Sequence, residues 1–378
     1  MRAASIVTLV VAVVGCSSAG AAPVPGSAIG RLSAGAGHTC VVDRGGGVSC
    51  WGSNVDGQLG DGGEIDSAQP QPMLGLSNVV QIAAGSYHTC ALAAAGGVSC
   101  WGWNVGGQIG DGTNTNRLSA FQVPGLPEIA AVAAGSYHSC GLCADGSARC
   151  WGQNDAGQLG NGSSLNSGAP VGVFSLPPSA GIAAGGRHAC ARLVDGTVQC
   201  WGGNDAGELG DGTAVAHAFP EPVIGISDAV AIAAGFNHTC ALRAGGAVSC
   251  WGANGYGQLG DGGNLDSPLP VAVAGLPPAA SITAGYNHSC AVLLDGEARC
   301  WGWNAAGQLG DGTLTDSGSP VTVVGLPQVS TLAGGGFHTC AGTLDGRVAC
   351  WGSNDSGQLG DGTTTDHPTP APVAGVIF

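Results

Sequence analysis

Histidine and cysteine recur along this chain at spacings that could support either metal binding or disulfide formation. His-Thr-Cys, or a close variant of it, begins at residues 38, 88, 138, 188, 238, 288 and 338, and Cys-Trp-Gly begins at residues 50, 100, 150, 200, 250, 300 and 350. Residues two apart on a strand share a face, so His38, Cys40 and Cys50 could present one nitrogen and two sulfurs to a metal ion. No fourth ligand recurs with them, and the thiols of an exported protein oxidise. We therefore expect disulfides, with no metal and no cofactor.

The ten-residue spacing within each cysteine pair fits a β-hairpin. Between Cys190 and Cys200, the dipeptide Asp195-Gly196 suits a three-residue loop with its glycine in the left-handed conformation. That register sets Cys190 opposite Cys200 in a non-hydrogen-bonded pair, with Cα atoms about 4.5 Å apart, at the close end of the disulfide range. We predict one such bond per hairpin, joining Cys40 to Cys50, Cys90 to Cys100, Cys140 to Cys150, Cys190 to Cys200, Cys240 to Cys250, Cys290 to Cys300 and Cys340 to Cys350.

Cys143 has no counterpart in the other copies of the motif. Two roles stay open for it: a free or partly buried thiol, or a competitor of Cys140 for Cys150.

Other polar residues of the motif are better explained by structure than by chemistry. We expect the seven motif histidines to bond neighbouring backbone, because a catalytic group copied seven times would make a strange active site. His217 and His367 fall in variable segments, where we expect them to be solvated. A calcium site built from Asn54, Asp56 and Asp61 would need more oxygen ligands than recur. Aspartate or asparagine instead ties a tight turn in each Gly-Asp-Gly corner, at residues 61, 111, 161, 211, 261, 311 and 361.

The repeat defines the elements that must position these residues. Residues 29–378 form seven 50-residue units without an insertion or deletion, and a period of 40 to 50 with one tryptophan motif per unit is typical of propeller blades. Residues 79–126 indicate a strand, a hairpin, a second strand, a glycine-rich corner and an outer strand near 121–123. We predict an all-β, seven-bladed β-propeller with four short antiparallel strands and one intra-hairpin disulfide per blade. No outer strand precedes the first unit, so we expect the two chain ends to share a blade.

The repeat also resembles a known family. Ala-Ala-Gly-Ser-Tyr-His-Thr-Cys-Ala-Leu (83–92) and Cys-Trp-Gly-Trp-Asn-Val-Gly-Gly-Gln-Ile-Gly-Asp-Gly (100–112) are similar to the regulator of chromosome condensation repeat. The core Trp-Gly-x-Asn-x-x-Gly-Gln-Leu-Gly returns in every unit, with Ile109 and Glu208 as its only changes. The resemblance implies a seven-bladed propeller. It also suggests guanine-nucleotide exchange as an activity, because the founding member of the family acts on a small nuclear GTPase.

Composition and the first residues point to an exported protein that does not bind nucleic acid. The chain has no lysine, and its ten arginines face 25 acidic residues for a net charge of −15, whereas phosphate binding needs clustered cations. Arg2 and an apolar run to Val14 indicate a signal peptide, too short to span a bilayer stably. Val13-Val14-Gly15-Cys16 resembles a bacterial lipobox. We expect residues 1–16 to be that signal with Cys16 lipidated, 17–28 a flexible tether, and the protein a cell-envelope lipoprotein or a secreted protein.

A few positions differ from repeat to repeat, although the residues around them are nearly constant. Aromatic, arginine and asparagine residues occupy two such sets, just before the motif histidine and just after Trp-Gly. Similar propellers, including the plant ultraviolet-B receptor, carry functional residues at the first place. These residue types favour a recognition face, although they could equally fill gaps between blades. The candidates are Tyr87, Trp103, Tyr137, Arg187, Phe236, Asn237, Tyr256, Tyr286, Asn287, Trp303 and Phe337.

We therefore expect a monomeric, non-enzymatic binding scaffold for a protein or a glycan, in contact with a membrane only through its lipid. Exchange activity is one alternative, but the export signal, the missing basic tail and the lack of an inserted loop count against it. A carbohydrate-active enzyme is the other, and it would need a pair of acids distinct from the repeat.

Overall fold

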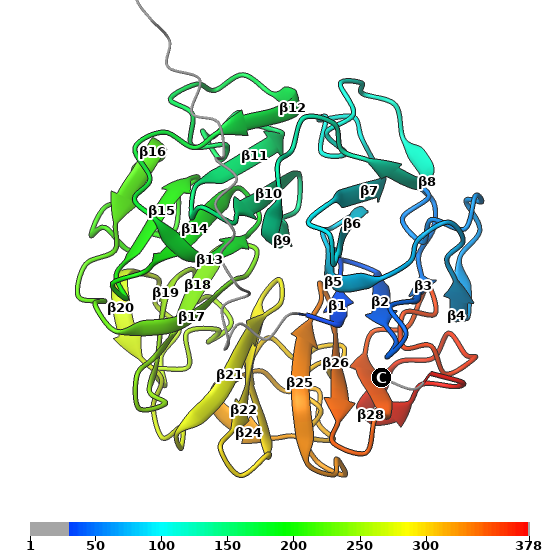
Figure 1. Cartoon of the computed structure of the whole chain (residues 1–378). Helices are drawn as coiled ribbons and strands as arrows, with labels where there is room; N and C mark the ends of the chain where they lie inside the picture. The colour runs from blue at the N-terminus through cyan, green and yellow to red at the C-terminus, as the bar shows by residue number, and fades with distance from the viewer. Residues whose placement is uncertain (1–29, 377–378) are drawn as a thin grey trace, which may run out of the picture.

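The computed structural model describes residues 30–376, so the predicted signal peptide, tether and Cys16 lie outside the described part of the chain. Seven four-stranded antiparallel sheets stand around a central axis (Figure 1). Each sheet is one blade, and its four strands follow one another in sequence, from β1 to β4 in blade 1 and from β25 to β28 in blade 7. The predicted all-β seven-bladed propeller is confirmed. The described residues contain no helix that is long and apolar enough to span a bilayer.

The four strand positions repeat around the ring. The strands nearest the axis are β1 (Leu32–Ala34), β5 (Val79–Ala84), β9 (Ile129–Ala134), β13 (Ser179–Ala184), β17 (Ala229–Ala234), β21 (Ala279–Ala284) and β25 (Val329–Gly334). The second strands are β2 (His38–Val42), β6 (His88–Ala93), β10 (His138–Cys143), β14 (His188–Leu193), β18 (His238–Arg243), β22 (His288–Leu293) and β26 (His338–Thr343). The third strands are β3 (Val48–Gly52), β7 (Val98–Gly102), β11 (Ala148–Gly152), β15 (Val198–Gly202), β19 (Val248–Gly252), β23 (Ala298–Gly302) and β27 (Val348–Gly352). The outer strands are β4 (Ser67–Pro72), β8 (Arg117–Gln122), β12 (Ser167–Gly172), β16 (His217–Pro222), β20 (Ser267–Ala272), β24 (Ser317–Thr322) and β28 (His367–Pro372).

The hairpin between the second and third strands has the predicted register. Cys190 faces Cys200, Leu193 N donates to Thr197 O at 2.9 Å, and Gly196 has φ of 87°. All seven predicted disulfides form, with Cα atoms 4.0 to 4.1 Å apart. Cys143 is buried at the end of β10 and takes no part in these seven bonds. Because Cys140 is bonded to Cys150, the alternative in which Cys143 competes for Cys150 is wrong.

Two expectations about the outer strands need correction. Blade 1 is complete, because β4 pairs with β3 of the same repeat, so the ends of the chain do not share a blade. Blade 2's outer strand is Arg117–Gln122 and begins before the predicted residues 121–123. The outer strands pair with a neighbour on one side only and are half exposed. They therefore tolerate polar residues and proline, and they lack the alternation of apolar and polar residues by which a strand is recognised in a sequence.

Hydrophobic cores lie between blades. Leu59 and Met73 of blade 1, for example, pack in one cluster with Ile82 and Trp101 of blade 2. Each motif tryptophan is fully buried and also reaches back to the preceding blade, where its indole donates to a backbone carbonyl of the corner loop. Trp101 Nε1 donates to Gln58 O at 2.9 Å, and Trp51 closes the ring by donating to Gln358 O at 2.9 Å. The other five tryptophans make the same bond at 2.8 to 2.9 Å.

Candidate binding face

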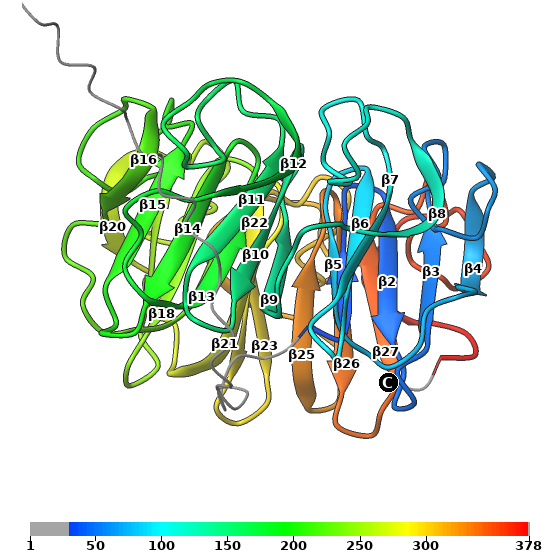
Figure 2. The ribbon, with the colours of Figure 1, turned by 45° about the horizontal axis from the view of Figure 1, so that its top comes forward.

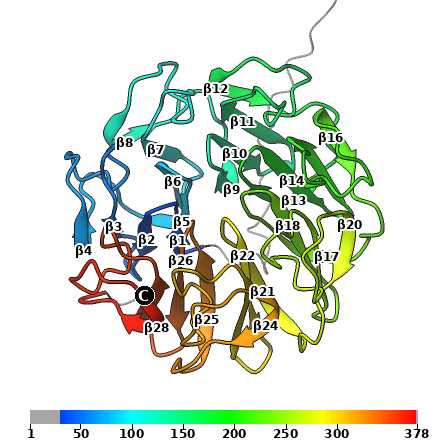
Figure 3. The same cartoon turned by 180° about the vertical axis from the view of Figure 1, so that it is seen from behind.

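The antiparallel strand order sorts the loops onto two rims (Figure 2). The turns between first and second strands, such as 35–37, lie at one end with the long loops between third and fourth strands, such as 53–66. We call this end the corner rim. The hairpin loops, such as 43–47, lie at the other end with the links to the next blade, such as 73–78, and we call that end the hairpin rim. Figure 3 shows the ring from behind.

The predicted residues all lie on the corner rim, and all eight aromatic rings among them make ring contacts, in two clusters. In the first cluster, Trp103 packs edge-on against Tyr87 and Tyr137, with ring centroids 6.1 and 5.7 Å away. Because Tyr137 belongs to blade 3, this cluster crosses the seam between blades 2 and 3.

The second cluster runs from the rim to the axis. Trp303 contacts Tyr256 at 6.2 Å and Phe337 at 5.4 Å between centroids. Phe337 in turn contacts Tyr286 at 5.5 Å, and Tyr286 contacts Phe236 at 4.8 Å. This cluster therefore joins blades 5, 6 and 7.

Both sequence interpretations of these residues have structural support. The rings pack across blade seams, as gap-filling residues would. Yet Tyr87, Tyr256 and Phe337 are 38 to 44% exposed, and none of the eleven candidates is buried. Aromatic rings with accessible faces therefore remain on the surface of the corner rim.

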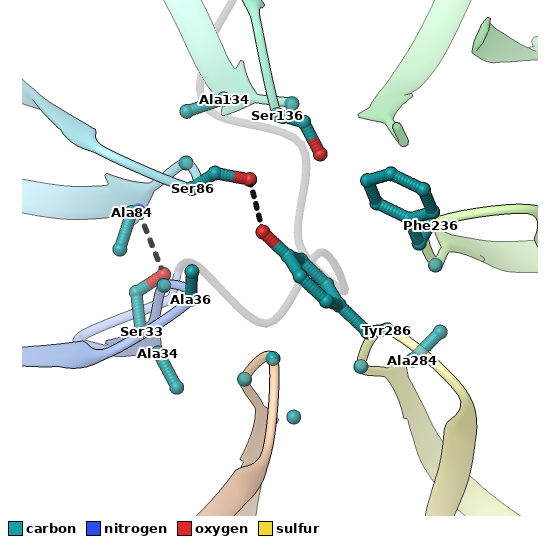
Figure 4. Close-up of a pocket in the computed structure, with 18 of the residues that line it drawn as sticks. Ser33, Ala34, Ala36, Ala84, Ser86, Ala134, Ser136, Phe236, Ala284 and Tyr286 are labelled. Carbon is teal, nitrogen blue, oxygen red and sulfur yellow. Dashed lines mark hydrogen bonds between the residues drawn. The ribbon is translucent and has the colours of Figure 1, made fainter. Parts of the chain in front are cut away.

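Tyr286 spans the axis itself. It points from blade 6 toward blade 2, where its hydroxyl lies 2.5 Å from Ser86 Oγ (Figure 4). The two groups lie at the wall of an axial cavity of about 210 Å³, which is lined mainly by glycine and alanine and also by Phe236 and Ser136. Burial raises the pKa of the Tyr286 hydroxyl, so it stays protonated and available as a donor.

The polar candidates are held by their neighbours. Arg187 forms an ion pair with Asp155 of blade 3, a partner that sequence reasoning missed. Asn237 and Asn287 each accept a backbone hydrogen bond at their carbonyl oxygen, from Ala253 N and Trp303 N, both at 2.8 Å. Arg187 thus bridges blades 3 and 4 on the surface, whereas the backbones of the two asparagines fix the start of the corner loops.

The buried motif histidines connect blades through hydroxyl groups, not through neighbouring backbone as expected. His38 Nε2 lies 2.9 Å from Thr89 Oγ1 of the next blade, and Thr89 Oγ1 donates to Gln58 O at 3.0 Å. Since the hydroxyl proton goes to the carbonyl, Nε2 must be the donor to Thr89. The contact between histidine and hydroxyl recurs at five more seams. The preceding glycine makes room for the ring, because a Cβ on Gly85 would lie 2.4 Å from His88 Cε1.

The seam between blades 3 and 4 is the exception. Ala189 stands where the other blades have threonine or serine, and neither ring nitrogen of the buried His138 has a hydrogen-bond partner. The signal was present in the sequence, as the residue after each motif histidine is a hydroxyl residue in six of seven repeats.

The structure also decides between the alternatives for the other histidines and cysteines. His38 contacts Thr89, and Cys40 is bonded to Cys50, so the metal-ligand alternative for that motif is wrong. Within residues 30–376, no group of three His, Cys, Asp or Glu is placed to hold a metal ion. His217 and His367 are not merely solvated, because they contact Asp211 and Asp361 at 3.3 and 3.0 Å.

The corner aspartates tie turns as predicted. Asp61 Oδ1 accepts from Gly63 N at 2.9 Å and from Asn54 Nδ2 at 3.1 Å. Asn161 does the same work in blade 3, where it accepts from Ser163 N at 3.1 Å.

The geometry defines a class of protein: a closed seven-bladed propeller with an aromatic rim, in which a tryptophan of each blade hydrogen-bonds to the preceding blade. Comparison then gives the family, because the profile described as "Regulator of chromosome condensation (RCC1) repeat" matches residues 45–92, 95–142, 145–192, 195–242, 245–292, 295–341 and 345–377. The chain belongs to the RCC1 repeat family. No curated protein sequence matches it significantly.

Solved structures share the fold at low sequence identity. Yeast RCC1 (Prp20), in a crystal structure with Kap60 bound to it, is 23% identical with a TM-score of 0.78, covering 91% of this chain and 85% of that one. Human WBSCR16 is 22% identical with a TM-score of 0.79, covering 87 and 94%. The CRINKLY WD40 ectodomain of the Arabidopsis receptor kinase ACR4 is 21% identical with a TM-score of 0.56, covering 91 and 97%.

Proposed function

We propose that this chain is a binding scaffold, anchored outside the cytoplasm by a lipid on Cys16, that holds a protein or a glycan against its corner rim. The observation that carries the proposal is the pair of aromatic clusters, whose rings remain accessible although they also pack together. Large, rigid aromatic side chains are enriched at binding hot spots. The invariant frame beneath them offers a rigid support for recognition.

Capture on intact cells tests the function. The protein is cross-linked to its surroundings and recovered, in parallel with the triple variant Trp103→Ala, Trp303→Ala, Tyr256→Ala. We expect a partner that is recovered with the parent and lost with the variant. The matched control changes three exposed residues of the hairpin rim, Leu74→Ala, Val194→Ala and Leu294→Ala, which are 83, 66 and 71% exposed. Equal recovery by the parent and both variants would overturn the assignment of the face.

The location has separate support. Seven disulfides are compatible with a non-reducing, extracytoplasmic environment, and Val13-Val14-Gly15-Cys16 resembles a lipobox. Detergent phase partitioning of cell extracts tests the anchor. The parent should enter the detergent phase, whereas Cys16→Ser should stay in the aqueous phase; the parent in the aqueous phase would contradict lipidation.

Guanine-nucleotide exchange is a second candidate, favoured by membership of the RCC1 repeat family. Prp20p from Saccharomyces cerevisiae, a solved structure with the same fold, is described with binding properties toward Gsp1p and histones. A nucleotide-release assay with small GTPases decides the matter for this chain. Dose-dependent acceleration would establish exchange, and unchanged release would leave binding as the function.

A further inference from the structure

Charge is distributed very unevenly between the two rims. The corner loops hold sixteen of the chain's 25 acidic residues and none of its ten arginines. The other nine acidic residues share the strands and the hairpin rim with eight arginines, and Arg187 lies in a turn of the corner rim beside Asp155. The loops meant are 53–66, 103–116, 153–166, 203–216, 253–266, 303–316 and 353–366.

The fold needs the oxygen atoms of these residues but not their charge. At the end of the first corner loop, Asp66 Oδ1 accepts from Asn54 N at 2.7 Å. Asn116 and Asn166 accept the equivalent bond in blades 2 and 3 at 2.9 and 2.8 Å. A neutral amide can therefore replace the carboxylate in this hydrogen bond. The negative charges at this position in blades 1, 5, 6 and 7 are not needed for the fold; they belong to Asp66, Asp266, Asp316 and Asp366.

Two more carboxylates lie at positions where the fold does not require an acid. Asp205 and Asp355 are exposed at the tip that follows the motif asparagine, whereas Asp155 at the same position is paired with Arg187. Val55 and Val105 occupy the same position in other blades, so an acid is not required there. Because like charges on one face repel one another, their accumulation costs stability unless a partner of opposite charge uses them.

The chain already shows how this rim binds one cation. Arg117 lies at the start of β8, with its guanidinium 4.6 Å from the centroid of Phe121 and 2.6 Å from Asp111 Oδ2. An aromatic face and a carboxylate thus hold a single arginine together. The aromatic cluster around Trp303 lies on blades 5, 6 and 7, whose corner loops hold seven of the acidic residues, and it offers the same two components toward solvent.

We propose that the corner rim docks a positively charged, arginine-rich segment of a protein. This inference rests on the proposed function and names the chemistry of its partner. Carboxylates of the corner loops attract the segment over a distance of about 8 Å at physiological salt, and aromatic rings then stack on its guanidinium groups. Arginine is preferred to lysine because its planar group stacks on rings.

Binding of labelled nona-arginine to the full chain, measured by fluorescence anisotropy at 50 and 300 mM salt, tests the inference. One variant carries Asp66→Asn, Asp266→Asn, Asp316→Asn and Asp366→Asn, changes that Asn116 and Asn166 show to be compatible with the fold. The matched control carries Asp43→Asn, Asp195→Asn, Asp295→Asn and Asp345→Asn, the same four charges taken from turns of the hairpin rim.

We expect the corner-rim variant to lose at least about tenfold in affinity and the hairpin-rim control less than about twofold, with nona-lysine weaker than nona-arginine and binding weaker at high salt. Equal losses in the two variants would overturn the inference, since net charge alone would then explain binding. Absence of nona-arginine binding would overturn it as well. If cell capture still depends on Trp103 and Trp303 in that case, the proposed function stands and its partner is not a cation.

Discussion

The hydroxyl of Tyr286 lies 2.5 Å from Ser86 Oγ, across the axis of the ring, although the two residues are 200 positions apart in sequence. This bond joins blade 6 to blade 2, which no backbone pairing connects. It also brings the second aromatic cluster next to the blades that carry the first.

Loss of this bond should destabilise the ring. We expect Tyr286→Phe to lower the free energy of unfolding by about 1 kcal/mol, because it deletes one part-buried hydrogen bond. Denaturant unfolding followed by tryptophan fluorescence measures the effect. Tyr256→Phe is the control, as that ring is 44% exposed. Equal stability of Tyr286→Phe and the parent would contradict the structural role of the hydroxyl.

Adding the missing hydroxyl between blades 3 and 4 should stabilise the protein. Ala189→Ser places an oxygen where Ser139 and Ser289 have theirs, within reach of His138 Nε2 and the Gln158 carbonyl. We expect a gain of about 1 to 2 kcal/mol, since a buried imidazole that lacks partners acquires one. The reverse change, Ser139→Ala, should cost a similar amount at the neighbouring seam. Melting curves compare the three proteins, and a lower melting temperature for Ala189→Ser would refute the account.

Low pH should unfold the protein before its carboxylates titrate. Burial lowers the pKa of the motif histidines from 6.5 to about 3 or about 4, with neighbouring histidines adding to the shift for four of them. The folded state therefore binds fewer protons than the unfolded chain, and stability is full above pH 6.5 and falls below it. At pH 5 each histidine costs about 2 kcal/mol, so seven together rival a typical stability of about 5 to 15 kcal/mol.

Circular dichroism between pH 8 and pH 4, with the disulfides intact, follows this transition. We expect a midpoint between about pH 4 and pH 6. A native spectrum that persists at pH 4 would contradict this expectation, since the cost of keeping the histidines neutral would then be too small to unfold the protein.

Glu208 should make the folded state less stable as the pH rises, which is opposite to the effect of the histidines. It replaces the motif glutamine, keeps that residue's bond by accepting from Ala206 N at 2.9 Å, and is buried, which raises the pKa of its carboxyl above the ordinary 4.5. The folded state then holds a proton that the unfolded chain has lost, so the contribution of Glu208 falls as pH rises from 4.5 through the raised pKa. Glu208→Gln should be more stable than the parent at pH 7.5 by about 1 to 2 kcal/mol, and the difference should be smaller at pH 6. Parallel denaturant titrations at the two pH values measure it; a difference independent of pH would point to packing.

Reduction should unfold the propeller. In the chain-entropy model, each bond that closes an eleven-residue loop stabilises the fold by roughly 2.7 kcal/mol, or about 19 kcal/mol for seven as an upper estimate. The reduced protein should therefore melt far below the oxidised one in calorimetry. An unchanged melting temperature after complete thiol release would contradict this expectation.

Features that depend on nearby residues could be predicted from the sequence, whereas contacts between residues far apart in the sequence could not. The interval between Cys190 and Cys200 defined a hairpin, its register and its disulfide, because these depend on eleven consecutive residues. The outer strands were misplaced because Ser67–Pro72 is polar, proline-containing and half exposed, and therefore lacks an alternating pattern. The rim position of Trp103 and Trp303 followed from the repeat. The contact of Tyr286 with Ser86 could not, since it depends on the width of the ring at the axis.

The hydrogen bond from each motif tryptophan to the preceding blade also suggests how such a ring arose in evolution. Every 50-residue unit contains its own disulfide, an indole that fits the unit before it and a corner carbonyl that receives the unit after it. A duplicated unit would thus bring along both halves of a joint, and its new neighbours would need no compensating change. Inheritance of whole blades, followed by drift in the few rim positions that no joint uses, would produce a chain with the uniform frame and variable face seen here.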